Sequence, residues 1–492
     1  MGARSINDLQ SIAAYARDRV NAQLFNYALS VAILHRPDTK DLDLPVFAGV
    51  FPDKFVDSRV FERAREEATI VPEGSRRPII VPTDYTASDL EEEHRLWYFR
   101  EDMGVNLHHW HWHLVYPFEA SDRRIVDKDR RGELFYYMHE QIVARYNFER
   151  FSNRMPRVGR LSNFRAAIPE GYFPKLDSLV ASRSWPARIS GAVLKDLNRE
   201  VDQVRLDISD LERWRERFLE AISQGSVVDQ AGNRQPLDER RITINAIQVQ
   251  ADGGKSNVMN THWQQSDLNL SKGMDFIPRG DVFARFTHLQ HVPYTISLQV
   301  NNDSGAQRLG MVRIFLAPKL DERGQQFLFK DQRLMMIELD KFVTALRPGQ
   351  NILKRRSTES TVTIPFERTY RNLDTRPAGG AGEQNFNFCG CGWPQNMLIP
   401  KGTPEGLRSE LFVMISDYEQ DRVQQDLAGT CNDAASYCGV RDRLYPDLRA
   451  MGYPFDRLAR QGSDTLGTFL TPNMKTQDVA IVFTDRVTPA RA

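Results

Sequence analysis

The stretch N-L-H-H-W-H-W-H-L-V-Y-P, from Asn106 to Pro117, holds four of the ten histidines of the chain. His109 and His113 are four residues apart. On a helix this spacing places both rings on one face, about one turn apart. Two imidazoles in that arrangement can share one metal ion. The stretch therefore predicts a metal-binding helix, and Pro117 marks its end because proline breaks a helix.

A third histidine for the same ion is available on the next helical run. His139 lies in the run from Arg131 to Phe151, and a facing helix of this kind would complete a three-histidine site. Copper, zinc, iron and nickel all accept imidazole, so the histidine count alone does not choose the metal. His108 and His111 fall on other faces of the first helix, and we interpret them as packing or supporting groups. An aromatic core helix with hydrogen-bonded histidines is the alternative, but the extra histidines favour the metal site.

Longer stretches resemble a known family. E-D-M-G-V-N-L-H-H-W-H-W-H-L-V-Y-P, followed by R-G-E-L-F-Y-Y-M-H-E-Q-I-V-A-R-Y-N, resembles the first copper site of arthropod hemocyanins and prophenoloxidases. F-A-R-F-T-H-L-Q-H and F-C-G-C-G-W-P-Q are similar to insect prophenoloxidase sequences, and the resemblance covers nearly the whole chain. It implies that His109, His113 and His139 hold one copper ion.

The resemblance breaks where Q-P-L-D-E passes directly into R-R-I-T-I-N, at Arg240. The family has a type 3 site there, in which two coppers with three histidines each bind dioxygen between them. Its second trio comes from another H-x-x-x-H helix and a later single histidine. Only three histidines follow the first site in this chain, and no two of them have that spacing: His262, His288 and His291. We therefore expect one of the two copper sites, and one copper ion, in this chain.

The resemblance implies a phenoloxidase-family copper oxidoreductase. Such enzymes hydroxylate monophenols and oxidise o-diphenols to quinones, in melanin synthesis and innate immunity. Phenols and dioxygen are the implied small-molecule partners, and other prophenoloxidase chains are implied partners in homo- or hetero-oligomers. One copper supplies one electron, whereas reduction of dioxygen to bound peroxide takes two, so we expect less than full activity from a single site.

Two other interpretations remain open at this point. The chain could be a catalytically inactive relative that acts as an oligomer partner, a decoy or a hexamerin-like storage protein. It could also be an incomplete gene model or an alternative transcript of an active enzyme. Loss of the second-site helices would leave apolar faces around His113 and Met138 exposed or paired differently.

A multidomain α + β fold is expected from the length of 492 residues and from the change in hydrophobic period. The predicted parts are a remnant of the N-terminal helical domain at 1–48, a truncated helical copper-site domain at 49–241 and a C-terminal antiparallel immunoglobulin-like β-sandwich at 242–492. The beginning of the N-terminal domain, with its activation site, is expected to be missing.

Hydrophobic spacing predicts the individual elements. Helical spacing occurs in Ile6–Arg19, Ala22–His35, Phe55–Ala68, Leu194–Ile208 and Leu211–Ile222. After Arg241 the period changes to two, and the alternating runs with turn signals between them predict strands. These runs include Ile242 to Val249, Tyr294 to Val300, Met311 to Leu316, Thr361 to Ile364 and Val479 to Thr484.

Charge and hydropathy exclude two classes of partner. Lysine and arginine number 65 and are balanced by 65 acidic residues, so no overall field favours nucleic acid or an anionic membrane. No apolar run approaches the length of a transmembrane helix, and the N-terminus has no apolar signal core. Insect prophenoloxidases typically reach the hemolymph without a signal peptide, so the resemblance implies an extracellular location.

The four cysteines lie close together in the sequence: Cys389, Cys391, Cys431 and Cys438. Their C-x-C and C-x6-C spacings fit common zinc sites poorly, and disulfides in an oxidising fluid are the favoured interpretation. Sequence alone allows three pairings. The family resemblance implies that Cys389 pairs with Cys431, and Cys391 with Cys438.

Overall fold

The computed structural model describes residues 2–39, 42, 44–83, 92–117, 123–172, 177–178, 183–184, 188–201, 203–223, 242–274, 276–364, 392–425, 437–438, 443–456 and 462–490. Within these ranges the chain forms two compact units. The larger unit comprises 1–83, 95–157 and 241–492, and the smaller unit comprises 84–94 and 158–240. These units cut across the predicted domain limits, which stay a prediction.

Two N-terminal helices open the larger unit. Helix α1 (Ile6–Arg17) begins where the Ser5 hydroxyl accepts a hydrogen bond from the backbone of Asp8. Helix α2 (Ala22–His35) has the predicted limits, and the Asn21 side chain caps its first turn by accepting from two backbone N–H groups. Capping of this kind satisfies donors that have no partner within the helix.

The segment that carries the metal motif is helical. Short helix α3 (Phe47–Val50) and helix α4 (Ser58–Ile70) come first, and α4 begins after the capping residue Asp57. Helices α5 (Trp97–Arg100), α6 (Met103–Val115) and α7 (Arg123–Val126) follow. Helix α8 (Arg131–Ser152) matches its predicted limits to within one residue. Among the described residues, no helix is long and apolar enough to cross a membrane.

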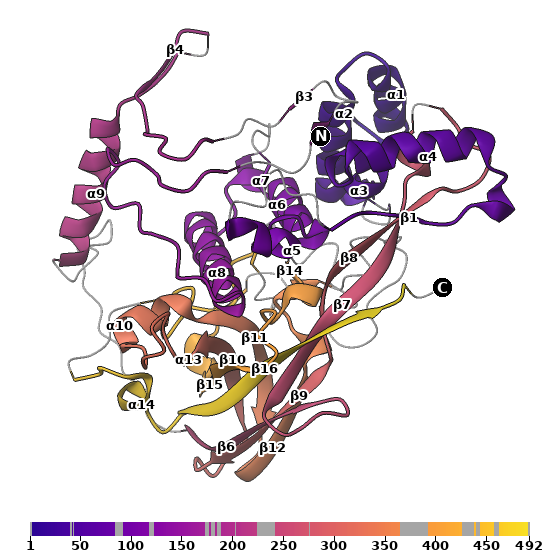
Figure 1. Ribbon diagram of the computed structural model, residues 1–492. Helices are drawn as coiled ribbons and strands as arrows, with labels where there is room; N and C mark the ends of the chain where they lie inside the picture. Colours follow the sequence, from indigo (N-terminus) through magenta and orange to yellow (C-terminus); the bar gives the residue numbers. More distant parts are fainter. Residues whose placement is uncertain are drawn as a thin grey trace. The chain divides into compact units, whose positions relative to one another are not determined.

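Residues after 241 form the predicted sandwich (Figure 1). One sheet has the strand order β1-β8-β7-β16-β15-β10-β11, and the facing sheet has the order β12-β9-β6. The strands are β1 (Ile79–Ile80), β6 (Ile242–Ala251), β7 (Val258–Asn269), β8 (Phe283–His291), β9 (Tyr294–Asn302), β10 (Arg308–Pro318), β11 (Ile337–Leu346), β12 (Gly349–Arg356), β15 (Leu407–Asp417) and β16 (Met474–Thr488). A small parallel pair joins β13 (Thr363–Ile364) to β14 (Trp393–Pro394). Short helices α10 (Phe329–Gln332), α13 (Tyr418–Asp421) and α14 (Leu466–Phe469) lie in the connections.

The sandwich is antiparallel apart from two pairs in its larger sheet. Strand β16 pairs with β7 in parallel, and β1, from the helical segment, joins the edge strand β8 in parallel. The second pair places Ile79 opposite Ala284 and so ties the helical segment to the sandwich. The inner faces of both sheets share one apolar core.

Strand β6 explains a shift in the alternating pattern. The apolar residues change from even to odd positions between Ile244 and Ile247. The pairing of β6 with β9 shifts register between Ile244 and Ala246, so one extra residue restores the inward direction. Ile244 and Ile247 are both buried as a result.

The prediction of a helix at Leu194–Ile208 is wrong. The smaller unit has a hairpin there, formed by β4 (Leu197–Arg199) and β5 (Val204–Leu206). The Asp196 carboxylate accepts a hydrogen bond from the backbone of Ile208, so the chain must fold back before helix α9 (Ile208–Ser223) begins. Helix α9 confirms the next predicted helix. A second hairpin joins β2 (Asp177–Ser178) to β3 (Arg183–Ser184).

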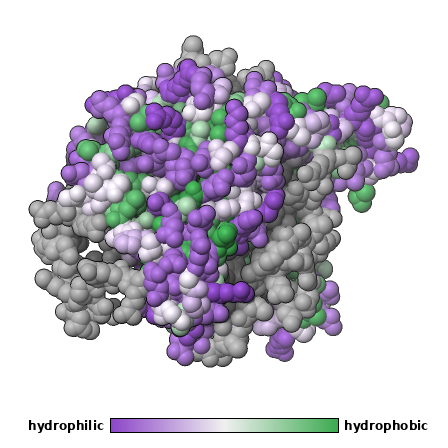
Figure 2. Space-filling view, turned by 90° about the horizontal axis from the view of Figure 1, so that it is seen from below, coloured by the Kyte–Doolittle hydropathy of each residue, from purple (hydrophilic) through white to green (hydrophobic). Residues whose placement is uncertain are grey.

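On the face shown in Figure 2, hydrophilic residues cover most of the described surface, with hydrophobic residues scattered among them.

Candidate metal centre

The structure brings the predicted histidine pair together on α6. The Nε2 atoms of His109 and His113 lie 2.9 Å apart, and their ring centroids lie 4.6 Å apart. Metal-to-imidazole bonds are about 2.0–2.1 Å long, so two ligands at right angles on one ion are separated by about 2.9 Å. The two nitrogens therefore have the separation that one shared ion requires. Without an ion, the same distance fits one N–H donating to the other ring.

His139 lies on α8, and its Nδ1 atom faces the backbone of the same helix. Its Nδ1–H donates to the backbone oxygen of Phe135 at 2.7 Å, and its ring packs on the Phe135 ring with centroids 4.2 Å apart. This hydrogen bond fixes the tautomer and leaves the Nε2 lone pair available. Among the described residues, no three histidine, cysteine, aspartate or glutamate side chains lie close enough together to hold an ion. The structure thus assembles two of the three predicted ligands and leaves the third against its own helix.

The electrostatics of the pair favour neutral rings. Partial burial lowers the pKa of His109, and the nearby His139 lowers it further. Burial also lowers the pKa of His113, with smaller contributions from His109, Arg131 and His139. A metal ion binds the neutral form of imidazole, so these shifts keep both rings ready for an ion at neutral pH.

Helix α6 is positioned at its first turn by a cap and by close packing. The Asp102 carboxylate accepts a hydrogen bond from the backbone of Val105 at the first turn. Met103, Leu107 and Trp112 are buried, and the Trp112 ring lies edge-on to the His113 ring with centroids 5.7 Å apart. Gly104 lies so close to Pro394 that an added Cβ would meet the proline ring at 2.6 Å, so the helix packs directly against β14.

Helix α8 is held by the sandwich through buried polar contacts. The Tyr137 hydroxyl donates to Glu338 at 2.8 Å, and the Gln141 side chain bonds both to Met336 and to the backbone of Glu338. Arg145 donates to the backbone oxygens of Leu398 and Glu338 at 2.8 and 2.7 Å. Gln141 and Arg145 belong to no sequence motif that predicted their role. Polar residues on an otherwise apolar helical face were the available signal.

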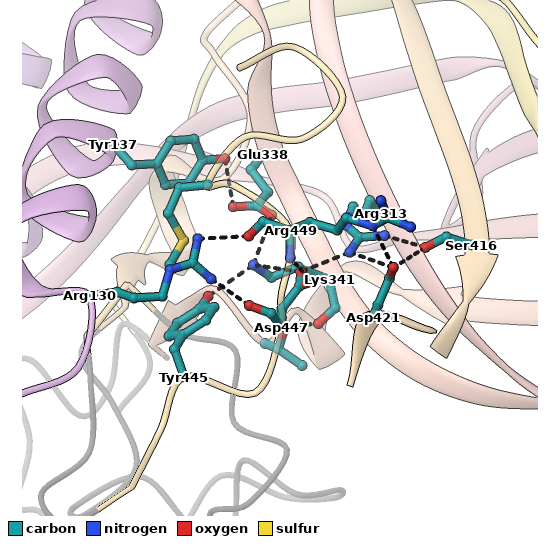
Figure 3. A network of polar contacts seen from close by, with 12 residues as sticks. Arg130, Tyr137, Arg313, Glu338, Lys341, Ser416, Asp421, Tyr445, Asp447 and Arg449 are labelled. Atoms are coloured by element: carbon teal, nitrogen blue, oxygen red, sulfur yellow. Dashed lines mark hydrogen bonds and ion pairs between the residues drawn. The ribbon is translucent and has the colours of Figure 1, made fainter. Parts of the chain in front are cut away.

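A buried charge network continues from this contact into the C-terminal region (Figure 3). Arg313 donates to Asp421 at 2.9 Å and to Asp447 at 2.8 Å, and all three side chains are almost fully buried. Arg130, at the start of α8, pairs with Glu133 at 2.7 Å and also donates to backbone oxygens of Asp447 and Arg449. The network therefore fixes the beginning of α8 to the segment around 447.

His108 and His111 are the other two histidines on α6, and neither belongs to the predicted ligand set. His108 is buried, and its Nδ1–H donates to the backbone oxygen of Gly392 at 2.9 Å. Burial lowers the pKa of His108 to about 4, and it lowers the pKa of His111 to about 4 as well. Both therefore remain neutral at physiological pH, and their interpretation as packing or supporting groups stays a prediction.

The three later histidines are buried in the larger sheet of the sandwich. Nε2 of His288 lies 3.0 Å from the Ser266 hydroxyl, and Nε2 of His291 lies 3.2 Å from the Ser357 hydroxyl. His262 lies on the neighbouring strand β7. All three thus lie on strands of the sandwich, outside the helices that carry the proposed ligands.

The cysteine predictions fall largely outside the described residues. Cys438 is disulfide-bonded and fully buried. Cys389, Cys391 and Cys431 lie outside the described ranges. Disulfide formation at Cys438 agrees with the sequence, whereas the two pairings stay a prediction.

Sequence comparisons match three family models in chain order. The hemocyanin all-alpha domain matches residues 1–41, the hemocyanin copper containing domain matches 47–279, and the hemocyanin ig-like domain matches 233–483.

Curated relatives match over nearly the full chain. Phenoloxidase 2 of Drosophila melanogaster is 56% identical over 574 residues, with 98% of this chain and 84% of the relative covered. Phenoloxidase 1 of Holotrichia diomphalia is 53% identical over 583 residues, with 100% of this chain and 85% of the relative covered. The alignment with the first relative spans 574 positions, whereas this chain has 492 residues. At least 82 positions of that alignment (574 − 492) are therefore occupied in the relative and missing from this chain.

Two solved structures share the fold. A scorpion hemocyanin in its activated state has a TM-score of 0.81 and 34% identity, covering 98% of this chain and 90% of its own. A hemolymph type prophenoloxidase from a crustacean has a TM-score of 0.81 and 25% identity, covering 98% and 85%.

Proposed function

This chain belongs to the arthropod hemocyanin and phenoloxidase family of copper proteins, and we propose that it binds a single copper ion through His109, His113 and His139. The proposed activity is a phenoloxidase-type oxidation of o-diphenols. We expect its rate to be lower than that of a two-copper enzyme, because the proposal includes only one copper site. The observation that carries the proposal is the 2.9 Å separation of the two Nε2 atoms on α6.

The third ligand is supported by the tautomer of His139. Its Nδ1–H is held by the Phe135 backbone, so only Nε2 can bind an ion. Reorientation of this side chain, on a helix fixed by the sandwich, would complete the trio. Copper held by these residues would supply one-electron redox chemistry. Phe135, whose side chain is 44% exposed beside His139, offers an aromatic surface on which a phenol ring can stack.

The single-site proposal rests on two further observations. The relatives have at least 82 aligned positions that this chain lacks. Four of the seven histidines outside the proposed trio have other partners: His35 and His108 bond to backbone oxygens, and His288 and His291 lie beside serine hydroxyls. These contacts support the proposal of a single copper site.

Phenols and dioxygen are the proposed small-molecule partners, and other phenoloxidase chains are proposed partners in an oligomer. A relative named phenoloxidase subunit 1 from Bombyx mori supports assembly. The hemolymph type of the crustacean structure supports an extracellular location in hemolymph.

A second candidate is a non-catalytic partner chain, which includes the decoy and storage roles. The partner role is supported by the side of α8 that carries His139. Phe135, Tyr136 and Val143 on this helix are 44%, 67% and 53% exposed. Apolar residues exposed together on one helix can form a contact surface for another chain.

Copper content and dopamine oxidation of the purified chain separate these candidates. We expect about one copper per chain and slow oxidation, and His113→Ala should lose both. His94→Gln, a histidine in the smaller unit, is the matched control. Two coppers per chain with full activity would contradict the single-site proposal, and one copper without any oxidation would favour the partner role.

A further inference from the structure

We propose that Tyr27, His35 and Lys128 form a cap on the C-terminal end of α6 and are positioning residues for the copper site. The inference rests on the proposed function, because it concerns the same site. Two of the three residues come from α2, which is far from the metal motif in the sequence.

Each of the last four backbone oxygens of α6 has a donor, and the cap supplies three of these donors. The last four carbonyl groups of an α-helix have no partner within the helix. Trp112 O accepts from the backbone of Tyr116 at 2.9 Å, which satisfies the first of them. The other three are satisfied by side chains: His113 O by the Tyr27 hydroxyl at 3.3 Å, Leu114 O by Nε2–H of His35 at 2.8 Å, and Val115 O by the Lys128 ammonium.

Burial makes two of these bonds important. His35 and Lys128 are only 8% and 7% exposed. An oxygen that loses its donor there cannot readily be compensated by bulk water. Lys128 also bonds to Ile125 O, so its ammonium joins the ends of α6 and α7. A cation at a helix C-terminus is favoured by the helix dipole as well.

The cap acts on the metal ligand that lies in the same turn. The backbone of His113 is itself an acceptor of the cap, while His109 lies one turn earlier. A helix whose terminal carbonyls lose their partners frays within its last turn. Fraying would move Nε2 of His113 away from Nε2 of His109, and the 2.9 Å separation would be lost. The cap residues thereby act through His113 and do not touch the ion.

Conservative variants separate the hydrogen bonds from packing. His35→Gln keeps an N–H donor, His35→Leu removes it, and Lys128→Met keeps the length of the side chain without its charge. Leu24→Ala on the exposed side of α2 and Lys354→Met on the surface of β12 are matched controls. Copper affinity is measured by competition with a chelator, and the ligand geometry is followed by the electron paramagnetic resonance spectrum of Cu(II).

We expect His35→Leu and Lys128→Met each to weaken copper binding by about tenfold and to change the Cu(II) spectrum, as supporting residues of metal sites do. His35→Gln should remain within about threefold of the wild type, and both controls should bind as the wild type does. Unchanged affinity and spectrum in His35→Leu and Lys128→Met would overturn the inference.

Hydrogen exchange of the metal-free chain provides a test that does not depend on copper. Backbone amides of residues 110–116 should exchange faster in His35→Leu and Lys128→Met than in the wild type, with recovery in His35→Gln. If the wild type binds no copper but these amides respond, the single-copper proposal fails while the cap stands. If the amides do not respond, the cap is wrong whatever the copper result.

Discussion

The two sides of α8 have opposite surroundings. The side that faces the sandwich buries Tyr137, Met138 and Gln141 and bonds its polar groups to β11 and the loop before it. The other side carries His139 among the exposed side chains of Phe135 and Tyr136. The position of α8 is thus determined by the sandwich, and the metal-site side can lose neighbours without loss of the helix.

The largest expected effect concerns the charge network that anchors the start of α8. Arg313→Met leaves the carboxylates of Asp421 and Asp447 buried without this partner, and we expect a loss of about 3–5 kcal/mol in the free energy of unfolding. Urea unfolding followed by circular dichroism measures it. Arg17→Met, at an exposed pair with Asp18, is the control and should leave the unfolding midpoint unchanged. A loss in the control of similar size would mean that charge alone is responsible.

A pair of alanine variants compares the two sides of α8 directly. Met138→Ala creates a cavity on the anchored side and should cost about 2–5 kcal/mol. Phe135→Ala on the exposed side should cost about 1 kcal/mol or less, since its ring is already half in solvent. Both are measured by urea unfolding. Equal losses would indicate that another part of the protein covers the exposed side in solution.

The pH dependence of stability tests the anchored side through Glu149, near the end of α8. Burial raises the pKa of Glu149 from its ordinary value to about 7. Between the two values the folded state binds more protons than the unfolded state, so stability should fall as pH rises from 4.5 to about 7. We expect a decrease of about 1–3 kcal/mol over this window.

The variant Glu149→Gln should flatten this dependence, because its amide does not titrate. Thermal unfolding between pH 5 and pH 8 measures the difference. Glu216→Gln, at an exposed position on α9, is the control and should retain the slope of the wild type. If the stability of Glu149→Gln still falls with rising pH as that of the wild type does, other titrating groups are responsible for the pH dependence.

The smallest expected effect is that of one hydrogen bond on the anchored side. Tyr137→Phe removes the donor to Glu338 and should cost about 1–2 kcal/mol. Tyr136→Phe, whose side chain is 67% exposed, should have no resolvable effect. Differential scanning calorimetry of the two variants gives the comparison, and a reversed order would contradict the assignment of the two sides.

Local signals were sufficient for much of the helical fold and for the histidine pair. Asn21 and Pro37 define α2, and Pro117 follows the end of α6. The four-residue spacing of His109 and His113 places their rings together in any regular helix. The fold class and the family are confirmed, whereas the ligand roles of His109, His113 and His139 stay predictions.

Long-range contacts could not be derived from local patterns. The apolar faces around His113 and Met138 were predicted to be exposed or paired differently. Met138 is buried in a cluster that includes residues of α6 and of the sandwich, His113 is partly exposed, and the exposed residues of α8 include Phe135 and Val143. Periodicity shows that a helix has an apolar face but does not name its partner. The hairpin at 197–206 was missed because the Asp196 side chain directs the chain back toward α9.

The contacts of α8 also determine when the copper site can form during synthesis. The side chain of Arg145 binds the backbone oxygens of Met397 and Leu398, which lie 252 and 253 residues later in the chain. On a ribosome, α8 is therefore made long before the groups that hold it. Contacts of such separation form late in folding because the intervening chain must first be ordered. We therefore expect copper to be loaded into the finished protein and not into the growing chain.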